Sequence, residues 1–234
     1  TFREQCEARG LRVCLPELIE GGRTDGGVRL TRLFNPLLFA QEITPVPCDV
    51  ETRRGSSMLV ITGPNSGGKT RLLQAVALVQ LLGQAGLYVP AEAATLRHAS
   101  GMFVSLVEGA KVDQQEGRLG SEMLRIRRLF EQSNDVSVVI IDELCSGTNP
   151  SEGEEIFRLE MSLLRELRPL VLITTHFLEF AKRLQADNDL ELEFLQVELD
   201  DNNRPTFGFI PGVAETSLAR QTAARLGVTR EELM

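Results

Sequence analysis

The sequence predicts an α/β fold in which a mainly parallel sheet is flanked by helices and accompanied by an antiparallel layer of strands. Three observations predict this fold. Apolar runs of strand length alternate with amphipathic helical segments along the middle of the chain. A glycine-rich loop, residues 63–70, joins one of these strands directly to a helix. Polar residues follow two further apolar runs where each run ends, which is the place where ligands bind in parallel sheets.

The composition is that of an ordinary globular protein. A length of 234 residues, with 42% hydrophobic and 25% charged residues, favours one sizeable domain for this alternating pattern. The net charge of -8 repels nucleic acid, so something other than net charge must arrange any contact with DNA. Four scattered cysteines and two histidines argue against a zinc site or a disulfide framework, and favour a cytoplasmic protein. No apolar run reaches the roughly 18 residues that a membrane span needs.

The first 55 residues predict extended structure. Residues 28–33 alternate like a strand, and Asn35-Pro36 is expected to interrupt any helix after it. Residues 44–50 predict a proline-stiffened extended stretch. We interpret this region as the antiparallel layer, flanking the ligand. Residues 1–27 are expected to be a lead-in from an upstream helical domain, and residues 28–234 to form the domain itself.

The glycine-rich loop matches the phosphate-binding pattern G-x-x-x-x-G-K-[ST]. An apolar strand, residues 58–62, precedes it and a helix, residues 71–82, follows it, as the motif requires. Its backbone N–H groups and the helix N-terminus are expected to face the phosphates of a nucleoside triphosphate, with Lys69 on the β- and γ-phosphates and the Thr70 hydroxyl on Mg²⁺. The predicted nucleotide-binding residues are Gly63, Pro64, Asn65, Ser66, Gly67, Gly68, Lys69 and Thr70.

Further strands and helices follow the loop in alternation. The expected strands are residues 101–107, 136–141 and 170–175, and residues 190–199 and 205–210 are expected to pair as a hairpin. The expected helices are residues 121–130, 149–168, 177–184 and 216–226, the second of them with Ser151 as N-cap and Glu154 in a capping box.

Two strand ends add candidate catalytic residues. Asp142 follows four aliphatic residues and suits Mg²⁺ coordination, directly or through water. Glu143 points the other way along the backbone and is the expected general base for an attacking water. His176 closes another strand, and we expect it to sense the γ-phosphate. By itself each of these residues would be interpreted as a solvated strand end or helix start, but the preceding phosphate loop favours a shared site.

These segments closely resemble the ATPase domain of the MutS family, which belongs to the ABC ATPase superfamily. The resemblance rests on residues 61–70, 86–91, 141–149 and 174–176, and it extends over about residues 28–227. It implies an ABC-type P-loop NTPase fold with ATP and Mg²⁺ as ligands, Glu143, His176 and Lys69 as catalytic residues, and Gly147 and Thr148 shaping the loop after the acid. It also implies a homodimer around a composite ATP site, and DNA binding by domains absent from this chain.

The chain departs from the family pattern at two places. The family signature S-x-F-x-x-E-M, which reaches the γ-phosphate of the partner subunit, is matched here by residues 116–123, with Gly117 at the serine position and Leu119 at the phenylalanine position. Arg118 and Ser121 are the candidates for replacing that contact. Residues 45–49 lack the aromatic side chain that stacks on adenine in the family.

The main hypothesis is therefore a Mg²⁺-dependent ATPase that couples nucleotide state and dimerisation to DNA binding by other domains of a longer protein, in DNA repair or recombination. The alternative is a nucleotide-gated interaction module with little hydrolysis, which the altered signature motivates. A transporter domain would carry the signature L-S-G-G-Q, which this sequence lacks. A P-loop kinase would leave Glu143 and His176 without a role.

Overall fold

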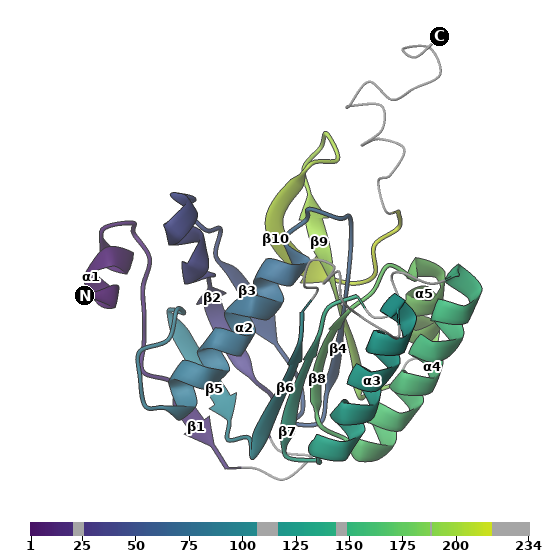
Figure 1. Cartoon of the computed structure of the whole chain (residues 1–234). Helices are drawn as coiled ribbons and strands as arrows, with labels where there is room; N and C mark the ends of the chain where they lie inside the picture. Colours follow the sequence, from purple (N-terminus) through teal and green to yellow (C-terminus); the bar gives the residue numbers. More distant parts are fainter. Residues whose placement is uncertain (21–25, 107–116, 144–148, 188, 217–234) are drawn as a thin grey trace.

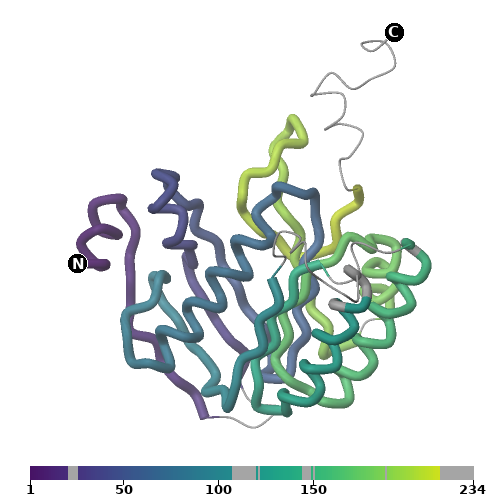
Figure 2. The backbone as a smooth tube through the Cα atoms, in the orientation of Figure 1, coloured from purple at the N-terminus to yellow at the C-terminus, as the bar shows by residue number. Residues whose placement is uncertain are grey.

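Two β-sheets and a set of covering helices make up the structure, which is a computed structural model (Figures 1 and 2). It describes residues 1–20, 26–106, 117–143, 149–187 and 189–216. The elements in chain order are α1 (Phe2–Glu7), β1 (Glu17–Ile19), β2 (Arg29–Leu33), the 3₁₀ helix η1 (Pro36–Gln41), β3 (Cys48–Glu51), β4 (Met58–Thr62), α2 (Lys69–Gln84), β5 (Ala93–Arg97), β6 (Gly101–Ser105), α3 (Gly117–Gln132), β7 (Ser137–Ile141), α4 (Pro150–Leu167), β8 (Leu170–Thr174), α5 (Leu178–Ala186), β9 (Leu192–Leu199) and β10 (Pro205–Pro211).

The larger sheet has six strands in the order β10-β9-β4-β8-β7-β6. All neighbouring strands from β9 to β6 run parallel, and β10 pairs antiparallel with β9 as the predicted hairpin. The prediction of a mainly parallel sheet is thus confirmed. Because β4, β8 and β7 are adjacent, the residues that follow these three strands meet at one edge of the sheet.

The smaller sheet has four strands in the order β1-β5-β2-β3. β2 runs antiparallel to both β3 and β5, as predicted for an antiparallel layer, whereas β1 is parallel to β5. Strand β5 was not predicted from the sequence. β1 lies before residue 28 and pairs within this sheet, and the expected boundary between residues 27 and 28 stays a prediction.

Alternation along the central strands creates two cores. Leu59 and Ile61 of β4 face α2 and the smaller sheet. Met58 and Val60 face the opposite side, where α3, α4 and α5 cover the sheet (Figure 1). β6 is an edge strand with Val104 40% exposed, so the prediction that residues 101–107 are a buried strand is wrong at this position. Among the described residues no helix is long and apolar enough to cross a membrane.

Two asparagines start helices at positions that the sequence analysis interpreted differently. Asn35 caps η1 by accepting a hydrogen bond from Leu37 N at 2.9 Å, so the Asn35-Pro36 pair begins a helical turn instead of preventing one. Asn149, and not Ser151, is the N-cap of α4, because its Oδ1 accepts from the backbone N of Ser151 at 3.2 Å. Proline fits the first turn of both helices.

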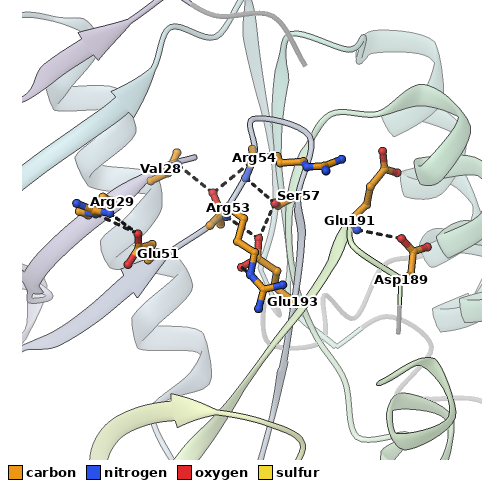
Figure 3. Close-up of polar contacts among 10 residues, drawn as sticks. Val28, Arg29, Glu51, Arg53, Arg54, Ser57, Asp189, Glu191 and Glu193 are labelled. Carbon is orange, nitrogen blue, oxygen red and sulfur yellow. Dashed lines mark hydrogen bonds and ion pairs between the residues drawn. The ribbon is translucent and has the colours of Figure 1, made fainter. Parts of the chain in front are cut away.

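A carboxylate fastens the connection between the two sheets (Figure 3). Glu193 of β9 accepts hydrogen bonds at Oε1 from Arg53 N at 2.7 Å and from Ser57 Oγ at 2.6 Å. Ser57 Oγ in turn accepts from Arg54 N at 3.1 Å. These bonds fix the turn between β3 and β4, and β4 leads directly into the glycine-rich loop.

Candidate nucleotide-binding site

The glycine-rich loop lies between β4 and α2, with β9 packed closely against it. A Cβ atom on Gly63 or Gly67 would lie 2.6 Å or 2.8 Å from Val197 Cγ2, which is too close for any side chain. Gly63 and Gly68 also have φ angles of 135° and 93°, which favour glycine. Both the backbone conformation and the tertiary packing therefore require glycine in this loop.

Lys69 is the first residue of α2 and is only 5% exposed. Its Nζ donates hydrogen bonds to the carbonyl oxygens of Gly63 at 2.9 Å and Pro64 at 3.2 Å. Asn65 Oδ1 accepts a longer one at 3.4 Å, and Glu143 Oε1 lies 3.4 Å away. The ammonium group is held beneath the loop, in contact with the predicted general base.

A chain of hydrogen bonds joins α2 to the ends of β7 and β8. Thr70 Oγ1 donates to Asp142 Oδ2 at 2.6 Å, and Thr174 Oγ1 donates to Asp142 Oδ1 at 2.7 Å. Thr174 Oγ1 also accepts from the backbone N of Glu143 at 2.9 Å. Glu143 has a φ angle of 44°, an unusual backbone conformation that this bond helps to hold. Thr174 was not predicted as a site residue. Its hydroxyl at the end of a buried strand is the sequence feature that could have indicated this role.

His176 follows β8 beside this network, and within the described part of the chain its side chain makes no hydrogen bond to it. Its side chain is exposed, and its ring centroid lies 4.1 Å from that of Phe177. Desolvation by neighbouring atoms lowers the pKa of His176, with the nearby Glu143 carboxylate opposing and the Lys69 charge reinforcing that direction. This direction favours the neutral form of the imidazole.

A pocket of about 640 Å³ opens over the loop. Seven of the predicted residues line it: Asn65, Ser66, Gly68, Lys69, Thr70, Asp142 and Glu143. His176 does not line it. The rest of the lining is mostly apolar and comes from the η1 region and β10, including Leu33, Phe34, Leu38, Ile43, Pro45, Val46, Phe207 and Phe209. Its volume lies within the usual range for small-molecule sites.

The apolar side of the pocket supplies aromatic groups that the sequence analysis did not find. Phe207 is 51% exposed, has a φ angle of 65° and lines the pocket from β10. Pro45, Val46 and Cys48 line the pocket from residues 45–49, which contain no aromatic, whereas Phe207 comes from a hairpin distant in sequence. A phenylalanine in a strand gives no signal of this role, because strand phenylalanines are commonly core residues.

The remaining predicted residues lie outside what the structure describes. Arg118 and Ser121 belong to α3, but their side chains are not described, and Gly147 and Thr148 fall in the undescribed residues 144–148. Their predicted roles stay predictions. The expected helix over residues 216–226 also lies almost wholly outside the described residues.

The oxygen atoms of Thr70 and Asp142 fit one side of a Mg²⁺ site. A hydroxyl and a carboxylate, 2.6 Å apart in the pocket wall, are the oxygen ligands that Mg²⁺ takes from proteins when phosphates and water complete its shell. No group of three or more His, Cys, Asp or Glu residues suited to a metal occurs in the described part of the chain.

Comparison with known proteins identifies the family. The family model of MutS domain V matches residues 59–228. Endonuclease MutS2 of Thermomicrobium roseum is 36% identical over 206 residues, which is 87% of this chain and 26% of that protein. Putative endonuclease MutS2 of Bacillus subtilis is 34% identical over 208 residues, again 87% and 26%. Endonuclease MutS2 of Levilactobacillus brevis is 30% identical over 226 residues, 96% of this chain and 28% of that protein.

The chain thus spans about a quarter of the length of the curated relatives that it matches. The family match covers the loop, the hydrogen-bonded network and β10, whereas the part of the pocket wall formed by Leu33 to Cys48 lies before the matched residues. The relatives carry the MutS2 name, so the resemblance that the sequence suggested is supported at the level of the MutS family and not of mismatch repair in particular. The chain belongs to the MutS domain V family.

Proposed function

We propose that this chain binds ATP with Mg²⁺ and hydrolyses it. The observation that carries the proposal is a single pocket whose polar side contains the phosphate loop, Lys69 and the Asp142-Glu143 pair, and whose other side is apolar. A phosphate group and an aromatic base need those two surroundings. Domain V is the ATPase domain of MutS proteins, so the family membership supports a nucleotide-related function in general.

Each residue receives a role from its position. Lys69 and the loop N–H groups would bind the β- and γ-phosphates, while Thr70 and Asp142 would hold Mg²⁺. Bound Mg²⁺ would supply positive charge on the phosphate oxygens. Glu143, 3.4 Å from Lys69, would orient the attacking water on the γ-phosphate side. A neutral His176 nearby would sense the γ-phosphate, and Phe207 would stack on the base.

We propose further that ATP is bound between two copies of the domain and that nucleotide state is relayed to DNA-binding domains of a longer protein, in repair or recombination. Two findings support this proposal. The chain belongs to the MutS domain V family, and it matches only about a quarter of the length of its relatives, which contain further segments. The relatives are named endonucleases. We assign any corresponding nuclease activity to portions of a longer protein outside the segment matched here.

A second candidate function is a nucleotide-gated interaction module that binds ATP and scarcely hydrolyses it. Gly117 and Leu119 favour it, because they replace the serine and phenylalanine of the family signature. The two candidates differ in one measurement, the ATPase rate per chain over a range of protein concentrations. A rate that rises with concentration supports a composite dimeric ATPase, and no hydrolysis at any concentration supports the gated module.

The decisive test of the proposed hydrolysis is Glu143→Gln. This variant should bind Mg·ATP as tightly as the wild type in calorimetry, while its turnover falls by about 10²- to 10⁴-fold because the general base is lost. Glu166→Gln, an exposed site on α4, is the matched control and should keep wild-type turnover. Unchanged turnover in Glu143→Gln contradicts the role of Glu143, and wild-type protein that binds neither ATP nor pyrophosphate contradicts the proposed function as a whole.

A further inference from the structure

Arg71 lines the pocket, and the phosphate-loop motif gives it no role. It lies on α2 directly after Lys69 and Thr70. Successive residues of an α-helix point about 100° apart, so three neighbours address three different walls. Lys69 contacts the loop and Glu143, and Thr70 contacts Asp142. Arg71 lies beside the start of η1, because Asn35 Nδ2 donates a hydrogen bond to its backbone O.

Two amide side chains hold Arg71 in place. Gln74 Oε1 accepts a hydrogen bond from Arg71 Nη1 at 3.0 Å and another from Asn35 Nδ2 at 3.1 Å. Asn35 Nδ2 also donates to the backbone O of Arg71 at 2.9 Å. Asn35 is 5% exposed and caps η1, so it is itself fixed. Both the backbone and the guanidinium of Arg71 are therefore held relative to the apolar wall.

The positive charge of Arg71 is not neutralised within the described part of the chain. Its contact with Gln74 is to a neutral amide, and none of the ion pairs between described residues includes it. A guanidinium has five N–H donors, and the hydrogen bond to Gln74 uses one. A fixed, partly buried cation with spare donors in a pocket wall suits an anionic ligand group.

We propose that Arg71 binds the α-phosphate of the nucleotide, the phosphate next to the sugar. This inference rests on the proposed function. Lys69 and Thr70 contact the loop and Asp142, where the terminal phosphates are expected. The Arg71 guanidinium instead shares its acceptor, Gln74 Oε1, with Asn35 at the start of η1, where the apolar wall begins. The anionic group between a base on that wall and the terminal phosphates is the α-phosphate. Asn35 and Gln74 act as positioning residues through Arg71.

The test compares two ligands in Arg71→Gln. ATP carries an α-phosphate, whereas pyrophosphate supplies two phosphates that Lys69 and the loop can bind without Arg71. Calorimetry should show ATP binding weakened by about 10- to 100-fold, the range for a lost charge-assisted hydrogen bond, with pyrophosphate binding within a factor of two to three of the wild type. Arg127→Gln, on the exposed side of α3, removes the same charge elsewhere and should change neither.

Two further variants keep the test informative if Arg71→Gln folds poorly. Arg71→Lys retains the charge without the planar fork, and Gln74→Met removes the acceptor that holds the guanidinium; each should give a smaller loss for ATP alone. Wild-type ATP affinity in Arg71→Gln, or equal weakening of ATP and pyrophosphate, overturns the inference. Wild-type protein that binds neither ligand overturns the proposed function instead, so the two failures are distinguishable.

Discussion

Two buried polar regions, one at the carboxyl ends of β7 and β8 and one on α4, are stabilised in different ways. At the site, Lys69, Asp142 and Thr174 are at most 6% exposed, and each of these side chains has hydrogen-bond or ion-pair partners. On α4, Glu160 is 1% exposed, and neither of its carboxyl oxygens has a hydrogen-bond partner among the residues that the structure describes. Burial alone raises the pKa of Glu160 to about 8.

The difference shows what a buried charge requires in this fold. In the site, partners come from β4, α2, β7 and β8, because the carboxyl ends of adjacent parallel strands bring polar side chains together. On α4 the same helix face carries Phe157, Met161 and Leu164 into an apolar core. In that apolar core a carboxyl group costs less free energy to bury when it keeps its proton. The charged groups of the site thus lie where several strand ends supply their partners.

The largest effect is expected from breaking the site network at its cation. Lys69→Met should weaken Mg·ATP binding by roughly 100-fold or more, because it removes the buried charge that would meet the phosphates and leaves Glu143 without that partner. Isothermal calorimetry measures the change. Lys182→Met is the control, because this lysine lies on α5 at the surface, where it pairs with Glu179 and donates to the backbone O of Glu215. Affinity equal to that of the wild type contradicts the placement of the phosphates over Lys69.

A smaller effect is expected when the acids lose the hydroxyl that orients them. Thr174→Val keeps the shape of the side chain but removes the bonds to Asp142 and to the backbone N of Glu143. Turnover should fall by about 10- to 100-fold, and the free energy of unfolding by about 1–3 kcal/mol, because a buried N–H and a carboxylate oxygen lose their partner. Thr174→Ser retains the hydroxyl and should recover most of the turnover. If valine and serine behave alike, the hydroxyl has no orienting role.

A change that affects stability and leaves the site intact sharpens the other side of the comparison. Since the folded-state pKa of Glu160 is raised from 4.5 to about 8, the wild type should lose stability as pH rises through that window, by up to about 1.4 kcal/mol per pH unit. Glu160→Gln does not titrate, so its stability relative to the wild type should increase from pH 5 to pH 8. Urea unfolding at both pH values measures this difference. Glu155→Gln, exposed on the same helix, should show none, and a pH-independent difference for Glu160→Gln contradicts a neutral buried carboxyl.

The features that could be predicted from the sequence are those encoded within one short stretch of chain. The phosphate loop, the strand ends at Asp142 and Glu143, and the parallel sheet follow from motif spacing and apolar runs, which one stretch of chain specifies. The position of Phe207 over the pocket and the bonds from Asn35 to α2 join segments far apart in the chain. No local pattern encodes such contacts, because they depend on how the two sheets pack. β5 was missed for a related reason, since a short strand is defined by its neighbours.

The contact of Val197 with the loop has a consequence for how the loop behaves. Because Gly63 and Gly67 fit directly beneath this side chain, the phosphate cradle is shaped by β9 as well as by its own residues. The loop is therefore preorganised before a ligand binds, and it loses little conformational entropy on binding. Replacing Val197 by a larger side chain would therefore deform the phosphate loop through β9, without changing any residue of the motif.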